Sequence, residues 1–346
     1  MGDVLRVVQC GLGSIGQGVV RALLETPQVK VVGAADVAPD RAGTDLGIVL
    51  GLGRRLRIGV EPDLDRLLRK VKADVAIIST TSSIRDLKPL VTSCIKKGLH
   101  VVTTCEELAH PVPAHAAAFR ELDQLARKKK VRILGTGVNP GFAMDWLPLA
   151  LTAPCLEVRR ISATRVLDLA TRRLSLQRRM GAGLNQHQFR RALAEGAVRH
   201  VGLLESAQMI ATGLGWSLDR IEETLEPTIA PRDLDTEHLR VPAGAVSGIK
   251  QYARGYRKGD LALSLDLQMY VGAEAPRDHI LVDGTPPIDV TVAGGIAGDT
   301  ATAAMVVNAL PKLLAAPPGL LSTRDLSLLH RLNPLELRAR LKAPRR

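Results

Sequence analysis

The sequence has few aromatic residues, with two Trp, three Tyr and three Phe among 346 residues. It also has only four cysteines, Cys10, Cys94, Cys105 and Cys155, with no CxxC pair and no histidine spacing typical of zinc. We therefore expect reduced thiols, no disulfide framework and no metal site. No apolar run approaches the roughly 18 residues of a membrane span, and no apolar leader precedes the first predicted strand. These absences predict a cytoplasmic protein without a membrane partner.

Acidic residues are outnumbered, with 35 Asp and Glu against 47 Lys and Arg, for a formal net charge of +12. The basic residues are spread along the chain, with small clusters at 128–130 and 338–346. No aromatic residues alternate with these clusters, as the stacking platforms of a nucleic-acid site would. We interpret the charge as a solvated, arginine-rich surface that attracts an anionic cofactor or substrate, and we predict no nucleic-acid partner.

The most informative motif is GLGSIG at residues 11–16. A short buried strand is predicted before it at 4–9, and a helix with one apolar face after it. A second predicted strand, 29–35, ends in Asp36, twenty residues beyond Gly16. This order of elements predicts a dinucleotide-binding βαβ unit, whereas the glycines alone would fit an ordinary turn.

Each part of this motif has a physical task in binding NAD or NADP. Gly11 permits a tight turn, Gly13 lets the backbone approach a pyrophosphate, and Gly16 lets helix and strand pack closely. The helix N-terminus offers N–H groups to phosphates, and Asp36 accepts hydrogen bonds from ribose hydroxyls. Asp36 favours NAD, but Arg41 could accommodate the 2′-phosphate of NADP, so the preference stays open. The predicted cofactor-binding residues are Gly11, Leu12, Gly13, Ser14, Ile15, Gly16, Asp36, Arg41, Ser79, Thr80, Thr81, Thr104, Cys105 and Asn308.

Strands and helices continue to alternate to about residue 140. Strands are predicted at 73–80, 100–104 and 131–135, with helices at 86–97 and 113–129. This rhythm indicates an α/β fold, with a Rossmann domain over residues 1–140 that contains a doubly wound parallel sheet. Ligands bind such sheets beyond the carboxyl ends of the strands.

The pattern changes after the loop at 137–141. Longer strands are predicted at 156–167, 261–271 and 288–292, and helices at 185–196, 198–214 and 218–225. We expect residues 141–295 to form an α+β substrate and dimerisation domain with a mixed or antiparallel sheet. Residues 296–346 are expected to form a helix, at 299–310, that returns to the Rossmann domain, followed by a tail.

Two adjacent carboxylates, Glu106 and Glu107, follow the strand predicted at 100–104. Neighbouring residues on an extended segment point in opposite directions, so one of the two, preferably Glu106, is predicted as the general base. The alternatives are a carboxylate that only caps a loop, and Cys105 as a covalent nucleophile. No lysine occurs between Lys97 and Lys128. A site without a cationic acid is poorly suited to an alkoxide, whereas a carboxylate suits an ammonium or iminium group.

Several longer motifs resemble one family. They are VVTTCEEL at 101–108, NPGF at 139–142, RVLD at 165–168 with TRR at 171–173, HVGL at 200–203 with ES at 205–206, and GGI at 294–296 through GDTAT at 298–302 to VNALP at 307–311. With them the chain resembles the 2,4-diaminopentanoate dehydrogenases and the native amine dehydrogenases over residues 4 to about 325. The resemblance implies a homodimeric enzyme that uses NAD(P)H to reduce the imine formed from a ketone or aldehyde and ammonia, or that catalyses the reverse deamination of an amine or a diamino acid. It also places the catalytic glutamate at Glu106 or Glu107.

The expected substrate-binding residues come from the loop after residue 138 and from the second domain. They are Asn139, Phe142, Trp146, Leu167, Thr171, Leu176, Gln177, Met180 and His200. Phe142 and Trp146 would share one helical face if a helix starts at 140–141, although both could equally pack in a hinge core. His200 and Gln177 could be structural. Asn308 is predicted to bind the nicotinamide carboxamide or, equally, to serve a helix-end or buried network.

Two other functions are compatible with the same fold. An alcohol or sugar dehydrogenase is disfavoured because such enzymes carry a lysine where Glu106 and Glu107 stand. A non-catalytic dinucleotide sensor is disfavoured because the carboxylate segment is intact.

Overall fold

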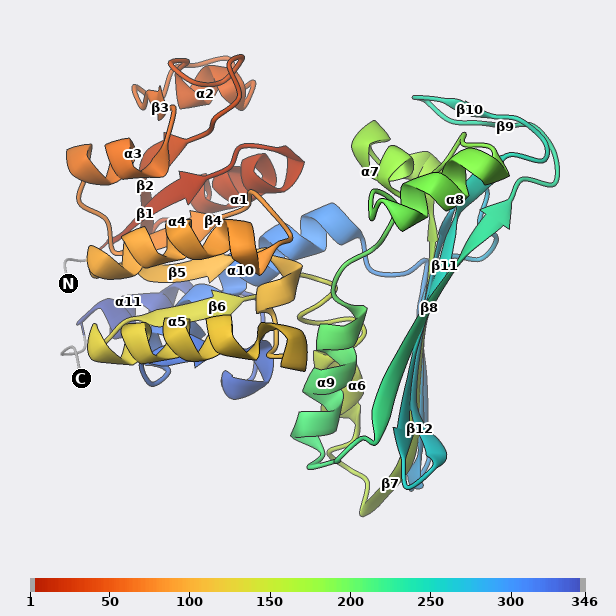
Figure 1. Ribbon diagram of the computed structural model, residues 1–346. Helices are drawn as coiled ribbons and strands as arrows, with labels where there is room; N and C mark the ends of the chain where they lie inside the picture. Colours follow the sequence, from red (N-terminus) through yellow and green to blue (C-terminus); the bar gives the residue numbers. More distant parts are fainter. Residues whose placement is uncertain (1–3, 343–346) are drawn as a thin grey trace. The chain divides into compact units, whose positions relative to one another are not determined.

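The computed structural model describes residues 4–342, which form two compact units (Figure 1). Unit 1 combines the chain up to Phe142 with the chain from Ala297 onward, and unit 2 comprises Ala143–Ile296. Residues 1–3, ahead of the first predicted strand, and residues 343–346, at the end of the predicted basic cluster, lie outside the described residues.

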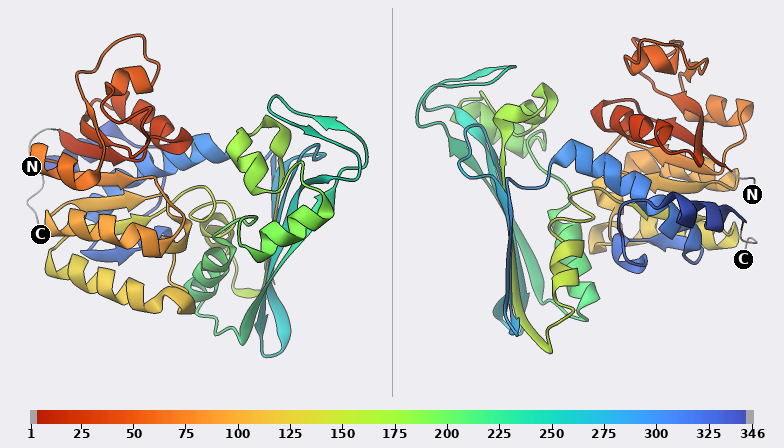
Figure 2. Two further views of the ribbon diagram at one scale, coloured as in Figure 1. Left: turned by 45° about the horizontal axis from the view of Figure 1, so that its top comes forward. Right: turned by 180° about the vertical axis from the view of Figure 1, so that it is seen from behind.

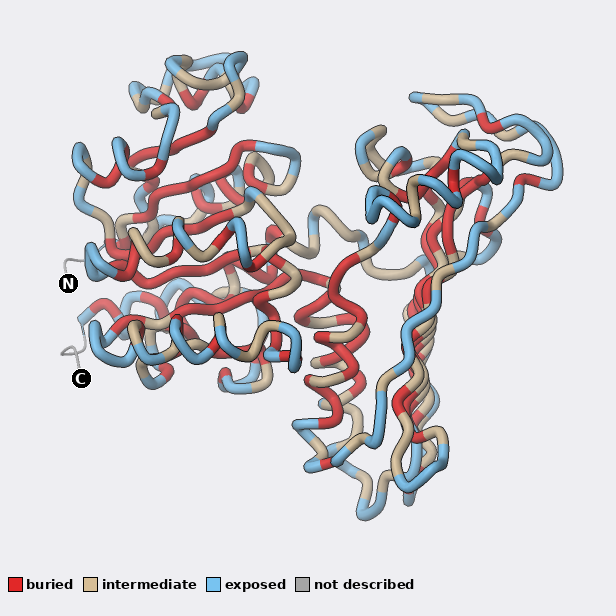
Figure 3. Tube along the Cα trace, in the orientation of Figure 1, coloured by how far each residue is buried: buried red, intermediate tan, exposed pale blue. Residues whose placement is uncertain are grey.

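Unit 1 contains, within residues 4–342, a seven-stranded parallel sheet in the order β15-β6-β5-β4-β1-β2-β3. Every residue of β4 and β5 is buried, as expected for parallel strands covered on both faces (Figure 3). The strands are β1 (Leu5–Cys10), β2 (Val29–Ala35), β3 (Val60–Glu61), β4 (Val75–Ile78), β5 (His100–Thr103), β6 (Arg132–Gly135) and β15 (Gly319–Leu321). The predicted Rossmann-type α/β fold is confirmed.

Helices cover both faces of this sheet, as the two views in Figure 2 show. Side chains of β1 alternate between the two cores, with Leu5 and Val7 on one side and Val8 and Cys10 on the other. The first core includes residues of α1 (Ser14–Leu24), α2 (Leu46–Val49), α10 (Gly298–Ala315) and α11 (Pro334–Lys342). The second includes residues of α3 (Leu64–Lys70), α4 (Ile84–Lys96) and α5 (Ala116–Lys128). The helix returning after unit 2, α10, packs against α1.

Unit 2 is built on a six-stranded mixed sheet in the order β14-β13-β7-β12-β11-β8, counted over the described residues. Only β7 and β12 pair in parallel, and the other neighbours are antiparallel. The strands are β7 (Glu157–Asp168), β8 (Arg220–Ile229), β11 (Val246–Arg257), β12 (Asp260–Tyr270), β13 (Arg277–Thr285) and β14 (Ile288–Ala293), with a separate hairpin of β9 (Leu234–Asp235) and β10 (Arg240–Val241). Helices α6 (Trp146–Leu151) and α9 (Leu203–Gly213) pack on the sheet, and α7 (Leu174–Arg179) and α8 (Gln186–Ala194) complete the unit. The separate mixed sheet confirms the fold class predicted for the second half.

One predicted element of unit 2 is wrong. Residues 218–225, predicted as a helix, belong mostly to the edge strand β8. Ile221, Leu225 and Ile229 recur every four residues, and this spacing places side chains on one face of a helix or of a strand alike. Pro227 lies in this strand, where an edge position tolerates the missing N–H donor.

Besides β8, six strands were not predicted, namely β3, β9, β10, β11, β13 and β15. The last of these adds an outer strand to the sheet of unit 1 from a segment that the sequence left unassigned. No helix within residues 4–342 is long and apolar enough to cross a membrane.

Candidate active site

The glycine loop between β1 and α1 has the form that a dinucleotide pyrophosphate requires. Gly11 has a φ of +88°, and a Cβ atom there would lie 2.4 Å from the carbonyl oxygen of Ser79. At Gly16 a Cβ atom would lie 1.9 Å from the carbonyl oxygen of Gly11, so helix and loop touch at this point. At Gly13 a Cβ atom would meet nothing within 4 Å. The loop therefore fits the cofactor, because it is closed toward the protein and open where a phosphate would approach.

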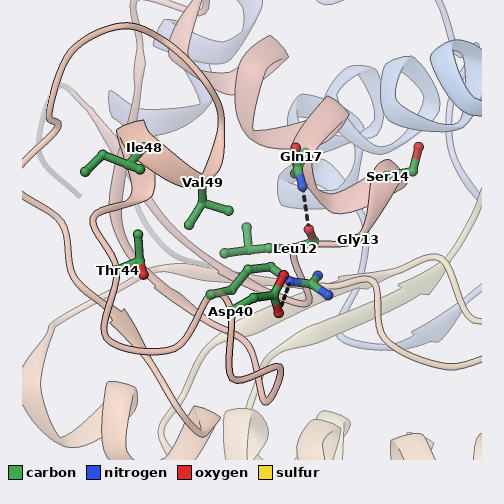
Figure 4. A pocket seen from close by; sticks show the side chains of 9 residues that line it. Leu12, Gly13, Ser14, Gln17, Asp40, Thr44, Ile48 and Val49 are labelled. Atoms are coloured by element: carbon green, nitrogen blue, oxygen red, sulfur yellow. Dashed lines mark hydrogen bonds and ion pairs between the residues drawn. The ribbon is translucent and has the colours of Figure 1, made fainter.

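A pocket of about 480 Å³ lies in front of this loop (Figure 4). One wall comes from the loop and from Gln17, whose Nε2 donates to the Leu12 carbonyl oxygen at 2.9 Å. The opposite wall comes from α2 and the segment before it. The lining residues are Leu12, Gly13, Ser14, Gln17, Asp40, Arg41, Thr44, Ile48 and Val49. Three residues predicted for the cofactor loop and Arg41 thus meet in one pocket.

Asp36 follows β2 and is almost buried, at 8 % exposure. Its Oδ2 accepts from the Leu12 N–H at 2.6 Å, and its Oδ1 accepts from the Ala38 N–H at 2.9 Å. Arg41 Nη1 donates to Asp36 Oδ2 at 3.1 Å, so the two residues with opposing predicted effects on cofactor preference form an ion pair. Asp36 therefore also ties the end of β2 to the glycine loop.

The segment after β4 faces the glycine loop from the next strand. Ser79 N donates to the Cys10 carbonyl oxygen at 2.8 Å, and Thr81 Oγ1 accepts from Ser83 N at 3.1 Å. The Cγ2 atom of Thr80 would lie 2.9 Å from a Cβ atom on Gly11. Predicted residues 79–81 and Gly11 are thus neighbours, as the rule for carboxyl ends of parallel strands requires.

The two carboxylates lie in a 3₁₀ turn, Glu106–Leu108, directly beyond β5. Both side chains are half-buried. Glu107 Oε2 accepts from the N–H of Ile84, the first residue of α4, at 2.8 Å, and lies 3.6 Å from His115 Nε2. The first turn of α4 therefore holds the Glu107 carboxylate, a contact close to the capping role that stood as the alternative to catalysis.

Cys105 is 1 % exposed, and its N–H donates to Thr103 Oγ1 at 3.2 Å. Burial, and then the charge of Glu106, raise the pKa of the Cys105 thiol above its ordinary value. The thiol is therefore held protonated, which argues against the nucleophile alternative.

The loop after β6 carries Asn139, whose two side-chain polar atoms are buried without a hydrogen-bond partner within residues 4–342. The expectation that Phe142 and Trp146 share a helical face is wrong. Residues 140–145 form turns, and α6 begins only at Trp146, because Asp145 accepts from the Trp146 N–H and acts as the N-cap. Phe142 packs against a core of unit 1, whereas Trp146 belongs to unit 2.

Asn308 lies on α10, and its Oδ1 accepts from the Leu332 N–H at 2.8 Å. This contact gives the residue the buried network role that stood as the alternative to cofactor binding. The Oδ1 atom of Asn308 is therefore already hydrogen-bonded to the segment that follows α10.

The remaining predicted residues lie in unit 2. Leu167 and Met180 are buried, whereas Thr171 is exposed and Leu176 is half-buried. The amide of Gln177 is used on both sides, since Nε2 donates to the Arg172 carbonyl oxygen at 2.7 Å and Oε1 accepts from Thr236 Oγ1 at 3.1 Å. These contacts favour the structural alternative for Gln177.

His200 stands before α9, where its backbone N–H and carbonyl group pair with the side chain of Gln251. Its Nδ1 is buried without a hydrogen-bond partner in the described residues. Burial, and then the charges of Arg179 and Arg165, lower the pKa of His200 to about 3. The imidazole is therefore neutral at physiological pH.

Comparison with known proteins agrees with this geometry. A model of the NAD-binding Rossmann oxidoreductase family matches residues 5–137, and the model described as the 2,4-diaminopentanoate dehydrogenase C-terminal domain matches residues 142–338. The chain is 30% identical over 331 residues to the 2,4-diaminopentanoate dehydrogenase of Acetoanaerobium sticklandii, covering 94% of each chain. The chain belongs to the 2,4-diaminopentanoate dehydrogenase family.

Further similarities extend to amine dehydrogenases and, for the fold, to other solved structures. An amine dehydrogenase of Streptomyces virginiae is 22% identical over 356 residues, which cover 94% of this chain and 97% of that protein. The solved structure of an amine dehydrogenase from Mycobacterium smegmatis has a TM-score of 0.86 at 24% identity, covering 95% of this chain and 98% of that one. The structure of GenD2 from gentamicin A biosynthesis, solved with NAD, has a TM-score of 0.56 at 15% identity, covering 99% and 92%. The predicted family, and the prediction of an NAD(P)-dependent dehydrogenase, are confirmed.

Five residues that line the pocket in front of the glycine loop were not predicted from the sequence, namely Gln17, Asp40, Thr44, Ile48 and Val49. A signal for part of this wall was present, because Asp45 is an N-cap whose side chain accepts from the Gly47 N–H. Among the described residues, no group of three or more His, Cys, Asp or Glu side chains is placed to hold a metal ion.

Proposed function

We propose that this protein is an NAD(P)-dependent amine dehydrogenase that forms an amine from a ketone or aldehyde and ammonia, and that deaminates an amine or a diamino acid such as 2,4-diaminopentanoate in reverse. The observation that carries the proposal is the carboxylate pair, Glu106 and Glu107, at the carboxyl edge of a dinucleotide-binding sheet, in a segment without lysine. The two relatives named 2,4-diaminopentanoate dehydrogenase and amine dehydrogenase support the same chemistry.

In the proposed reaction Glu106 acts as the general base. It takes a proton from ammonium, so that ammonia attacks the carbonyl carbon, and it assists the loss of water from the carbinolamine. Its negative charge then stabilises the iminium cation that remains. The nicotinamide, when bound, supplies the hydride that converts this iminium to the amine, and accepts it in the reverse direction.

We assign different tasks to the two carboxylates. Glu107 already accepts the N–H of Ile84, and that bond holds the 3₁₀ turn against α4. We assign the positioning role to Glu107 because of this bond, and we keep the preference for Glu106 as the base that the sequence suggested. Glu106→Gln should therefore lower kcat by 100-fold or more with nearly unchanged cofactor affinity, roughly the contribution of a general base. Glu107→Gln should retain partial activity and lower stability, and the reverse pattern would exchange the two assignments.

We further propose that NAD is preferred over NADP. The Asp36 carboxylate repels a 2′-phosphate, and the charge of Arg41 is already balanced by its ion pairs with Asp36 and Asp40. Titrations with NAD⁺ and NADP⁺ in parallel test this, and Asp36→Ala should narrow the difference in Kd by releasing Arg41. A clear preference of the unmodified protein for NADP⁺ would refute the argument from Asp36.

The substrate pocket is proposed to be lined by residues of unit 2, namely Trp146, Leu167, Thr171, Leu176, Met180 and His200. A neutral His200 can donate or accept a hydrogen bond without repelling an amine. The sparse aromatic content of the chain favours aliphatic substrates.

A homodimer is proposed through the sheet of unit 2. Alternate residues across four neighbouring strands differ in burial: one row is buried, Ala253, Leu265, Ala163 and Ile280, and the adjacent row is half-buried, Tyr252, Asp266, Thr164 and His279. A broad face of half-buried side chains is typical of a surface that a second copy covers. Thr164→Arg should therefore shift sedimentation toward a monomer, whereas Ser217→Arg, at an exposed position away from the strands, should not.

The decisive experiment measures NADH or NADPH consumption with a panel of small ketones and aldehydes at high ammonia, against the same panel without ammonia. Consumption that requires ammonia supports the proposal. Equal consumption of the cofactor without ammonia would instead indicate an alcohol dehydrogenase. No consumption with any substrate would favour a dinucleotide sensor.

A further inference from the structure

Several buried polar atoms beyond the strands of unit 1 have no hydrogen-bond partner within residues 4–342. They are Ser79 Oγ after β4, Thr136 Oγ1 after β6, and both Oδ1 and Nδ2 of Asn139. A buried polar group without a partner destabilises the fold, so such groups are retained where a ligand completes them. Asn139 is the notable case, because it lacks a partner on both its donor and its acceptor.

The loop that carries Asn139 is held from several sides. Thr136 N donates to the Thr103 carbonyl oxygen at 2.9 Å, and Val138 N donates to Thr302 Oγ1 on α10 at 3.2 Å. Gly141, with a φ of +125°, lets the loop close on itself, since a Cβ atom there would lie 2.6 Å from the Gly137 carbonyl oxygen. The Asn139 amide is thus presented by a fixed backbone rather than by a loose segment.

The order of the strands indicates which half of a dinucleotide lies near this loop. The glycine loop follows β1 and Asp36 follows β2, and these features bind the adenosine and the pyrophosphate. Starting from β1, the strands β4, β5 and β6 extend away from β2. The nicotinamide half of a cofactor that crosses this edge therefore lies toward the ends of β4, β5 and β6, where the unpaired atoms of Ser79, Thr136 and Asn139 are found.

The nicotinamide ring carries one group that matches a primary amide on both sides, its own carboxamide. We propose that Asn139 pairs amide to amide with this carboxamide, Oδ1 accepting from its N–H and Nδ2 donating to its oxygen. The inference rests on the proposed use of a nicotinamide cofactor, and it replaces both the substrate role expected for Asn139 and the carboxamide role expected for Asn308. Asn308 is less suited to the task than Asn139, because its Oδ1 already accepts the N–H of Leu332, whereas neither side-chain polar atom of Asn139 has a partner in the described residues.

Binding measurements test the pairing without any turnover. Calorimetry with Asn139→Ala should show NAD⁺ bound about 10-fold more weakly than by the unmodified protein, the effect of losing two neutral hydrogen bonds. ADP-ribose has the same adenosine and pyrophosphate but no nicotinamide. Its Kd for the Asn139→Ala variant should therefore stay within about twofold of its Kd for the unmodified protein. The 3-acetylpyridine analogue of NAD⁺ has a methyl group in place of the carboxamide NH₂, and the same substitution should weaken it less than NAD⁺.

Two results would overturn the proposal. Equal weakening of NAD⁺ and ADP-ribose would mean that Asn139 only supports the loop. Unchanged binding of NAD⁺, together with a raised KM for the carbonyl substrate, would return Asn139 to the substrate.

If Asn139→Ala does not fold, Asn139→Asp keeps the shape and the acceptor but loses the donor, and it should show the same selective loss for NAD⁺. These titrations do not depend on amine chemistry. A failed ammonia assay with intact selectivity for NAD⁺ would refute the proposed reaction and leave the pairing standing.

Discussion

Two ion pairs between β7 and β13 share the same N–O distance but differ sharply in burial, and they test how unit 2 is stabilised. Arg165 with Asp278 and Arg159 with Asp283 both have N–O distances of 2.7 Å. The first pair has side chains exposed by only 2 % and 2 %, against 48 % and 40 % for the second. Asp278 also accepts the N–H of Ile296, so Asp278→Ala leaves a buried guanidinium and a backbone donor without their acceptor.

We expect Asp278→Ala to lower the free energy of unfolding by about 3–5 kcal/mol, the usual cost of removing one partner of a buried pair. For a domain of this size that corresponds to a fall in Tm of about 6–20 °C. Asp283→Ala should cost less than about 1 kcal/mol, because solvent screens an exposed pair. The double variant Arg165→Met/Asp278→Leu removes both charges and should recover most of the loss.

The chain offers a selective probe for this experiment. Its two tryptophans, Trp146 and Trp216, both belong to unit 2, so the tryptophan fluorescence followed in a urea titration reports on the unit that carries the pair. The reasoning is refuted if Asp278→Ala is as mild as Asp283→Ala. It is also refuted if the double variant is as unstable as the sum of its two single substitutions, since the charges would then be uncoupled.

Two further substitutions follow from the same kind of reasoning. Burial lowers the pKa of His200 to about 3, so below about pH 6.5 the imidazole becomes protonated in the unfolded chain but not in the folded chain. The free energy of unfolding should therefore fall by about 2 kcal/mol at pH 5. Urea titrations from pH 7.5 to 5 should show this loss reduced in His200→Gln and retained in His238→Gln, an exposed control; equal pH profiles would contradict it. Gly16→Ala places a Cβ atom 1.9 Å from a backbone oxygen and should abolish NAD⁺ binding, whereas Gly18→Ala on the same helix meets only Ala303 Cβ at 3.6 Å. The Gly18 variant should bind normally and gain roughly 0.5–1 kcal/mol of stability, and normal binding by both variants would refute the argument.

The cofactor half of the fold could be predicted because its determinants are local. The tight turn at Gly11, the close contact at Gly16 and the acid at Asp36 are set by residues within one βαβ unit. The edge strand β8 was mistaken for a helix because an apolar spacing of four residues satisfies both periodicities, and only pairing with β11 decides between them. Strand β15 could not be foreseen, since its partner β6 lies almost two hundred residues earlier in the chain.

The site was harder to predict than the fold, for a related reason. The contact that holds Glu107 depends on Ile84, which a different strand-to-helix connection brings to its carboxylate. Whether an asparagine is available for a ligand also depends on distant residues. Asn308 is engaged by the N–H of Leu332, whereas the side-chain polar atoms of Asn139 have no partner in the described residues. The sequence identifies residues capable of chemistry, whereas long-range contacts determine which of their atoms are already used.

That distinction divides the polar groups at the carboxyl edge of unit 1 into two kinds. Thr103 Oγ1 donates to the Ile78 carbonyl oxygen and accepts from Cys105, and Glu107 accepts from Ile84, so both are consumed in holding loops beyond the strands. Asn139, on a loop held equally firmly, has neither donor nor acceptor satisfied in the described residues. Since leaving a buried polar group unsatisfied costs more free energy than one such loop bond contributes, the persistence of the unpaired Asn139 amide in a well-packed unit is explained most simply by a ligand that completes it. In our proposal the carboxylate segment supplies the chemistry at this edge, and the unpaired amide of Asn139 supplies the orientation that hydride transfer requires.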